Sequence, residues 1–228
     1  MDTLYRTPFC AAYWRAAARE FSSTKTLVAA ALLSAVCGVL DAFFIPVGGS
    51  LLQIRFSFFA VALCSMVTGP LIAIPSGFIV DLISYLVGGG SIYGYFPGYI
   101  LSAIGGAMIY AMFLYRSQVT LWRVYLSKLL VNLLINVMLG SVWRAYFGGK
   151  AYIVYLWSSG LKNLVLLPLE VMVLTYFLKK MLPALKKMHL INPAVEFTMT
   201  KKDIVISVIS GVVGAAALLW YLWYKLPR

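Results

Sequence analysis

The sequence predicts an all-α integral membrane protein, and three observations support that prediction. Of the 228 residues, 62% are hydrophobic and only 11% are charged, whereas soluble domains carry about a quarter charged residues. Apolar stretches of about 20 residues recur along the chain, each long enough to cross a hydrocarbon core of about 30 Å. These stretches lack the alternating pattern of barrel strands. Because a backbone in lipid must satisfy its own hydrogen bonds, we expect the spans to be helices.

The apolar stretches predict seven spans, at 26–44, 56–71, 71–88, 97–115, 122–143, 157–178 and 204–224. The second and third spans are joined tightly at the sequence TGP, residues 68–70. The last span contains the small-residue stretch SGVVGAAA, which favours close helix packing. We expect it to pack against the sixth helix or against a partner.

These spans divide the chain into four parts. We expect residues 1–25 to form a basic cytoplasmic segment, in which FCAAYWRAAAREF (9–21) is typical of a short amphipathic helix on the membrane surface. Residues 26–180 are expected to form a six-helix membrane domain. Residues 181–203 would be a basic cytoplasmic linker, and residues 204–228 an additional transmembrane helix with a short outer tail.

The distribution of Lys and Arg predicts the orientation. The N-terminal segment, the 116–128 connection with its Lys128, and the 179–203 connection together carry thirteen of them, and the other side carries six. By the positive-inside rule, this multi-pass protein of the cell membrane has its N-terminus in the cytoplasm. The net charge of +12 is then explained by topology and by the lipid bilayer with its anionic head groups, without a nucleic-acid partner.

The sequence offers no chemistry for an enzyme. FGGKAY lacks the spacing and the Ser or Thr of a phosphate-binding loop, so we expect no ATP use by this chain. The single histidine, His189, lies in the cytoplasmic 179–203 connection, away from any intramembrane serine. Cys10, Cys37 and Cys64 show no C-x-x-C spacing and are expected to be free thiols. We therefore predict no metal and no cofactor bound by this chain.

Three loops on the predicted outer side are rich in glycine and aromatic residues, namely 45–55, 88–98 and 144–152. Glycine permits close backbone approach, and aromatic rings supply flat contact area. We expect these loops to close over a site that is open to the outside. The candidate gate residues are Gly48, Gly49, Gly89, Tyr95 and Pro97. The alternative is that the aromatic residues form an interfacial belt.

Asp41, Asp81 and Glu170 are acidic residues within or at the end of predicted spans. Intramembrane ionisable residues are costly and are functional candidates by default. An ion-coupled transporter would use such carboxylates. The alternative is that each pairs with a neighbouring hydroxyl, amide or cation.

The fifth span carries polar and aromatic side chains that suit a flat heterocyclic ligand. Asn132 and Asn136 are spaced i, i+4 and so share a helix face, and Trp143 follows one heptad later. An asparagine offers both a donor and an acceptor. Lys162 at the outer end of the sixth span and Arg55 at the start of the second could each attract a ligand carboxylate or extend to the interface.

The first span carries a small-x-x-x-small face at Ala31 and Ala35, a pattern that allows close approach of another helix. Because the chain has no motif that uses energy, this face suggests docking to another membrane subunit.

Four stretches in this order resemble the folate-specific substrate-binding subunit of energy-coupling factor (ECF) transporters. They are RFSFFAVALCSMVTGP, YFPGYILSAIGGAMIYAMFLYR, NLLINVMLGSVWRAYFGGKAY and LKNLVLLPLEVMVLTYF, and the resemblance runs from about residue 22 to 180. It implies a six-helix subunit that binds a vitamin from outside. It also implies a membrane coupling protein, with Ala31 and Ala35 as the docking face, and two cytoplasmic ATPases, which use the ATP.

With this resemblance we expect a folate-binding subunit. The pterin would bind in a pocket of Phe96, Tyr99, Asn136 and Trp143, and the glutamate part would lie close to Arg55, Lys150 or Lys162. The chain departs from the family in its seventh span, in Ser159 where an arginine is expected, and in Glu170 where a glutamine is more usual. The alternatives are a subunit for another vitamin, or an ion-coupled secondary transporter that uses Asp81 and Glu170.

Overall fold

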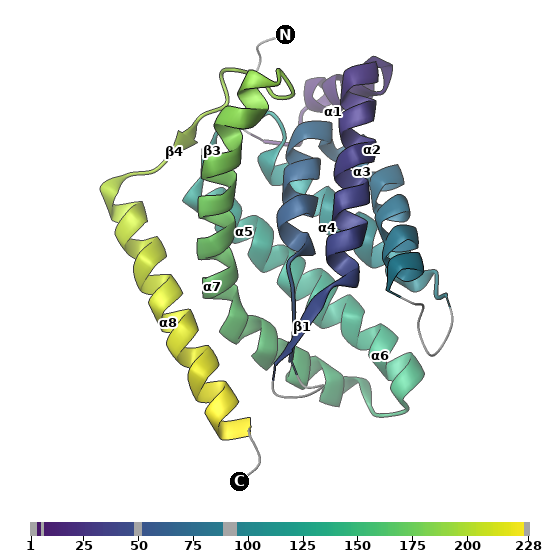
Figure 1. Cartoon of the computed structure of the whole chain (residues 1–228), viewed down its shortest axis with the longest axis vertical. Coiled ribbons are helices and arrows are strands. Elements are labelled where there is room, and N and C mark those ends of the chain that lie inside the picture. Colours follow the sequence, from purple (N-terminus) through teal and green to yellow (C-terminus); the bar gives the residue numbers. More distant parts are fainter. Residues whose placement is uncertain (1–3, 6, 48–51, 89–94, 226–228) are drawn as a thin grey trace.

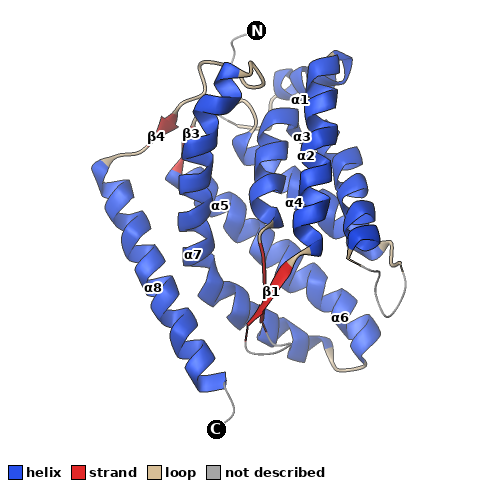
Figure 2. Ribbon diagram, in the orientation of Figure 1, coloured by secondary structure: helices blue, strands red, loops and turns tan. Residues whose placement is uncertain are grey.

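The computed structural model of the chain is almost entirely helical, with two short strand pairs (Figure 1, Figure 2). It describes residues 4–5, 7–47, 52–88 and 95–225, and only the backbone of 44–47, 52–55, 218 and 221–225. The helices are α1 (Ala11–Arg19), η1 (Glu20–Ser22), α2 (Thr24–Ala42), α3 (Ser57–Val87), α4 (Gly98–Leu114), α5 (Leu121–Leu130), η2 (Val131–Leu139), α6 (Gly140–Gly148), α7 (Tyr152–Lys187) and α8 (Lys201–Lys225). The strands are β1 (Phe44–Val47), β2 (Leu52–Arg55), β3 (Val119–Thr120) and β4 (Phe197–Thr198).

The predicted second and third spans are the two halves of α3, which folds back on itself at Gly69. Gly69 has φ 77° and ψ 177°, a backbone region that is essentially restricted to glycine. The carboxylate of Asp41 accepts hydrogen bonds from Ser57 Oγ at 2.7 Å and from Ser84 Oγ at 2.9 Å. Both ends of α3 therefore meet at one side chain, although a straight helix of its 31 residues would be about 46 Å long.

The bundle has two ends that different elements close (Figure 1). The antiparallel β1–β2 pair lies at the same end as the α6–α7 connection, and we call this the hairpin end. α1 and the parallel β3–β4 pair lie at the opposite end, the N-terminal end. The α4–α5 and α7–α8 connections, which carry β3 and β4, lie at the N-terminal end, opposite the α6–α7 connection, as the sequence predicted.

α5, η2 and α6 form one helical run of 28 residues, Leu121–Gly148, which corresponds to the predicted fifth span. Its middle third, η2, is a π-helix, a form that is rare in proteins and often found at functional sites. Four helical runs in the described part of the chain are long and apolar enough to cross a membrane.

α7 extends beyond the predicted sixth span at both ends and takes in the start of the predicted linker. α7 runs from Tyr152 to Lys187, and Leu182 and Leu185, each 6% exposed, belong to the main hydrophobic core. The linker is therefore only 188–200, and it is bound to the N-terminal end. Gln118 Nε2 donates to Ala194 O at 3.0 Å, and Glu196 N donates back to Gln118 Oε1 at 2.9 Å.

α8 packs along α7 (Figure 1), as predicted for the additional helix. A Cβ added at Gly214 would lie 2.8 Å from Pro168 Cγ and 2.9 Å from Leu169 N. The absence of a side chain at Gly214 therefore permits this close approach. The outward side of α8 is apolar, with Val212 and Val213 exposed.

α1 is helical as predicted, and its buried face packs against the bundle. Tyr13 is 1% and Ala17 0% exposed, and both pack against Tyr115 at the end of α4. The Tyr13 hydroxyl donates to Ala111 O at 3.0 Å. Burial raises the pKa of this hydroxyl, so it remains a donor at physiological pH.

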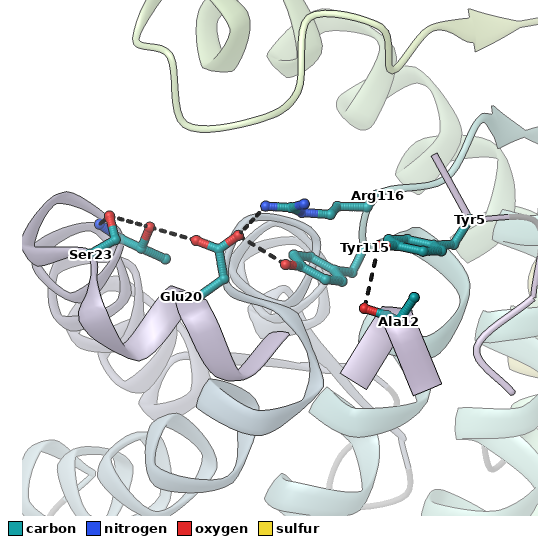
Figure 3. Close-up of polar contacts among 7 residues, drawn as sticks. Tyr5, Ala12, Glu20, Ser23, Tyr115 and Arg116 are labelled. Carbon is teal, nitrogen blue, oxygen red and sulfur yellow. Dashed lines mark hydrogen bonds and ion pairs between the residues drawn. The ribbon is translucent and has the colours of Figure 1, made fainter. Parts of the chain in front are cut away.

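A carboxylate at the N-terminal end joins three elements (Figure 3). Glu20 Oε1 accepts from the Tyr115 hydroxyl at 2.9 Å and from Arg116 Nη2 at 2.8 Å. Glu20 Oε2 accepts from Thr26 Oγ1 at 2.9 Å. We call these four residues the Glu20 clamp, since they connect η1 to the start of α2 and to the end of α4.

Candidate ligand-binding site

Five aromatic side chains meet at the hairpin end, and Phe96 lies at their centre. Its ring contacts Tyr99, Trp143 and Phe147 edge to face, with centroids 5.6, 5.2 and 4.8 Å away. It also stacks on Tyr146 at 5.8 Å. We call these residues the aromatic cluster. The structure thus brings together the three aromatic residues that the sequence assigned to a pocket, and adds Tyr146 and Phe147, which the sequence analysis placed in the 144–152 loop and which lie in α6.

Two local features hold the aromatic cluster in place. A Cβ added at Gly98 would overlap the Phe96 ring, so the ring can lie over the first turn of α4 because Gly98 has no side chain. Trp143 Nε1 donates to Ser102 Oγ at 3.0 Å. This bond joins α6 to α4 and gives the N–H of the half-buried indole a hydrogen-bond partner.

A second group, deeper in the span, is a chain of polar side chains from α5, η2 and α7. Asn136 Nδ2 donates to Asn132 Oδ1 at 2.9 Å, and Asn132 Nδ2 donates to Glu170 Oε2 at 2.8 Å. Lys128 Nζ lies 3.3 Å from the same Glu170 oxygen. We call these four residues the polar ladder. The predicted shared face of Asn132 and Asn136 is confirmed.

Lys128 was misplaced by the sequence analysis, which counted it among loop cations. It lies in α5, is 2% exposed, and its ammonium group is 3.8 Å from the centroid of the Phe58 ring. It is therefore a fourth intramembrane ionisable residue. Without it the count of Lys and Arg at the N-terminal end is twelve against six, so the predicted orientation does not change.

The acidic residues have the partners that the alternative interpretation foresaw. Glu170 pairs with a cation and an amide in the polar ladder, and Asp41 with the two serine hydroxyls at the ends of α3. Asp81 is hydrogen-bonded to the side chain of Tyr95, whose ring also meets Tyr85 edge to face at 5.2 Å. These contacts attach Tyr95, a predicted gate residue, to the end of α3.

The remaining predicted binding and gate residues do not belong to the aromatic cluster. Lys150 is exposed in the α6–α7 connection, and Pro97 is the N-cap of α4. Lys162 is partly buried in α7 and lies ten residues inside the helix, not at its end, because α7 begins at Tyr152. Arg55 is described only by its backbone, at the end of β2. Gly48, Gly49 and Gly89 lie outside the described residues.

Arg144 is a candidate that the sequence analysis used only to count charges. It lies on α6 between Trp143 and the 146–147 rings of the aromatic cluster. Its guanidinium donates from Nε to Gly140 O at 3.2 Å and from Nη2 to Asn136 O at 3.4 Å. Ser159, where an arginine was expected, is 1% exposed, and its hydroxyl accepts from Ser141 Oγ at 3.4 Å. Arg144 lies about one helical turn after Ser141, the partner of Ser159. It therefore places a cation in the part of the molecule where an arginine at position 159 was expected.

Ala31 and Ala35 lie on the outward face of α2, where both are exposed. Leu32 and Val36, on the same side, are 65% and 50% exposed. This face is small and apolar, as a docking face for a membrane partner requires. All three cysteines are free thiols, and among the described residues no group of His, Cys, Asp and Glu could hold a metal ion.

Comparisons with known proteins show to which family the chain belongs. The profile described as "ECF transporter, substrate-specific component" matches residues 25–178. The "Folate transporter FolT" of Clostridium novyi (strain NT) is 31% identical over 146 residues, which are 64% of this chain and 83% of that protein. The protein of the same name from Leuconostoc mesenteroides subsp. mesenteroides is 29% identical over 162 residues, 68% of this chain and 84% of that protein.

A solved structure agrees with this relationship. The "Crystal structure of FolT bound with folic acid" aligns with a TM-score of 0.59 and 30% identity, over 68% of this chain and 91% of that chain. The matched family region ends before α8 begins. Because the family comprises substrate-binding components of transporters, the comparison agrees with the expectation that the chain is not an enzyme. The chain belongs to the family of substrate-specific components of ECF transporters.

Proposed function

We propose that this protein is the folate-binding subunit of an ECF-type importer. It captures folate outside the cell and delivers it inward together with a membrane coupling protein and two cytoplasmic ATPases, which use the ATP. The observation that carries the proposal is the similarity, at about 30% identity, to two folate transporters and to a FolT structure with folic acid. The aromatic cluster supports it because a flat pterin ring needs such surfaces.

The site residues fit the two halves of folate. The pterin lies against Phe96, Tyr99 and Trp143, where each well-placed aromatic contact contributes about 0.5–1.5 kcal/mol beyond area burial, and Asn136 bonds to its polar edge. The anionic glutamate part lies toward four of the six cations of this end of the molecule, namely Arg55, Arg144, Lys150 and Lys162.

The orientation follows from the charge distribution. The hairpin end faces outward and the N-terminal end, with twelve Lys and Arg residues, faces the cytoplasm. The coupling protein docks on the exposed face of α2 at Ala31 and Ala35. Gly48, Gly49, Gly89, Tyr95 and Pro97 belong to the segments that close the outer mouth.

Binding of a panel of vitamins to the purified protein tests the substrate. Folate at 100 times its Kd should raise the apparent stability by about 2.7 kcal/mol, which is a thermal shift of roughly 5–10 °C for a protein of this size. Riboflavin, thiamine and biotin should give no shift. Equal shifts with these vitamins, or none with folate, would reject the folate assignment.

Reconstitution tests the mechanism. Proteoliposomes that contain the coupling protein and both ATPases together with this chain should take up folate when ATP is supplied on the side of the membrane where the ATPases are bound. Proteoliposomes with this chain alone should not. Uptake by the chain alone, abolished by an uncoupler, would favour an ion-coupled transporter instead.

A further inference from the structure

The polar ladder contains an ion pair that folate capture, as proposed above, does not by itself require. Lys128 and Glu170 have side chains that are 3% and 19% exposed and lie in helices that cross the membrane. A buried ion pair is weak evidence for stability, because apolar residues of similar volume often serve as well or better. Ionisable residues inside a membrane more often mark a function. The question is what this pair does for the site.

The chemistry of the four side chains fixes the direction of every hydrogen bond in the ladder. A carboxylate only accepts and an ammonium only donates. Glu170 therefore accepts from Lys128 and from the NH2 group of Asn132. The carbonyl oxygen of Asn132 must then face Asn136, which has to present its own NH2 group to it. The carbonyl oxygen of the Asn136 amide is consequently turned away from Asn132.

Asn136 stands between the ion pair and the aromatic cluster. It lies seven residues before Trp143 on one helical run, about 10 Å along the axis. Its neighbour Ile135 packs closely on α4, where a Cβ added at Gly105 would lie 2.8 Å from Ile135 Cδ1. Ser102, one turn earlier on α4, holds Trp143. The amide at the end of the ladder is thus near the rings that would hold the ligand.

We propose that Lys128 and Glu170 are a positioning pair that acts through Asn132 to hold the Asn136 amide with its carbonyl oxygen toward the ligand. This orientation selects heterocycles that present N–H donors at the facing edge. The proposal rests on the folate function. The pterin of folate has a ring N–H next to its 4-oxo group. In the 4-amino analogue aminopterin, the corresponding ring nitrogen has no hydrogen and accepts. The ladder therefore favours folate over aminopterin.

The main test variant is the double substitution Lys128→Met/Glu170→Gln, which is neutral and close to the original volume. The amide of a glutamine can offer either its oxygen or its NH2 group to Asn132, so the direction of the ladder is no longer enforced. The single substitution Glu170→Gln is less informative, because it leaves Lys128 buried without a counter-ion. Thr175→Val is the matched control, since Thr175 is also buried on α7 and its hydroxyl lacks a hydrogen-bond partner among the described residues.

The measurement is the Kd of folate and of aminopterin for each purified protein, with thermal unfolding of the ligand-free protein as the folding check. We expect the double variant to bind folate no more than about twofold more weakly, because the released Asn136 amide can still turn its carbonyl oxygen to the ligand. It should bind aminopterin roughly tenfold more tightly, because the amide can now donate to the unprotonated ring nitrogen and gain one hydrogen bond, so the preference for folate falls about tenfold. Thr175→Val should keep the preference of the wild type.

Three results would overturn the proposal. An equal loss of affinity for both ligands would make the ion pair merely structural, and an unchanged preference would show that the pair does not orient Asn136. A wild-type protein that binds neither ligand would reject the folate function and this inference with it. If the double variant does not fold, Asn132→Leu keeps the ion pair and interrupts the ladder, and it must reduce the preference to the same extent.

Discussion

Replacing Glu20 by alanine removes the carboxylate of the Glu20 clamp, and we expect the free energy of unfolding to fall by about 3 kcal/mol. The pair with Arg116 joins side chains that are 17% and 15% exposed. A hydrogen bond to a charged group contributes about 1.5–3 kcal/mol, and the partial exposure favours the lower value. Tyr115, 2% exposed, would keep a buried hydroxyl without its acceptor, which costs about 1–3 kcal/mol.

Thermal unfolding of the purified protein measures this loss. For a protein of this size 1 kcal/mol corresponds to roughly 2–4 °C, so the midpoint should fall by roughly 6–12 °C. Glu196→Ala is the matched control, because it removes the same charge from an exposed side chain. The hydrogen bonds of Glu196 to Gln118 and Val119 use its backbone, so the substitution leaves them in place. A midpoint for Glu20→Ala within about 2 °C of this control would refute the reasoning.

A double-mutant cycle isolates the ion pair from the other contacts of the clamp. The single variants Glu20→Gln and Arg116→Gln and their combination should give a coupling energy of about 1 kcal/mol or more. Because the pair is partly buried, the coupling should persist when the ionic strength is raised. A coupling energy near zero would mean that the two side chains do not stabilise each other.

The other predictions concern the site, the turn in α3 and the additional helix. Trp143→Phe keeps an aromatic ring beside Phe96 but removes the donor to Ser102, so the Kd of folate in a titration should rise roughly three- to tenfold, and Trp143→Ala should weaken binding further. Gly69→Ala should lower the free energy of unfolding by about 2 kcal/mol, because its backbone conformation excludes a side chain and a Cβ would lie 3.1 Å from the Tyr115 ring; unchanged thermal unfolding would contradict this. Truncation after Thr200 removes α8 and should leave folate binding intact. Truncation after Lys180 also removes Leu182 and Leu185 from the core, which should lower the free energy of unfolding by about 2–5 kcal/mol for each leucine. Equal unfolding midpoints of the two truncated proteins would disprove this difference.

The membrane helices and the aromatic cluster could be predicted from the sequence because local patterns determine them. Apolar length defines the spans, and the fold-back of α3 is visible in the TGP sequence at residues 68–70. Phe96, Tyr99 and Trp143 lie at the ends of spans that open on the same side, and the resemblance to the folate-specific family assigned them to one pocket. For Tyr146 and Phe147 the sequence could not distinguish a place in the site from a place in an interfacial aromatic belt. Only the packing of α6 against the start of α4 decides where their rings lie.

The polar ladder could not be predicted from local pattern, because its components come from distant parts of the chain. Lys128 lies five residues after Arg123 and directly before an apolar stretch, which is also the pattern of a lysine at a helix end. Only the contact of α5 with α7 brings Glu170 to it. The docked position of α1 has the same origin. Its amphipathic pattern predicts an apolar face, but whether lipid or the bundle covers that face depends on Tyr115 and Ala111 at the end of α4.

The junction of α6 with the start of α4 is held by a different kind of interaction from the N-terminal end, and this difference indicates where a ligand can enter. At the N-terminal end, the Glu20 clamp and the bonds of Gln118 to the linker join elements through hydrogen bonds, several of them charge-assisted. At the hairpin end, α6 is joined to the start of α4 by ring contacts and by one neutral bond, from Trp143 to Ser102. Charge-assisted bonds are roughly twice as strong as neutral ones, whereas aromatic contacts can exchange one flat partner for another. A pterin that takes the place of one ring on Phe96 would therefore open the junction of α6 with α4 without breaking any charge-assisted bond of the N-terminal end.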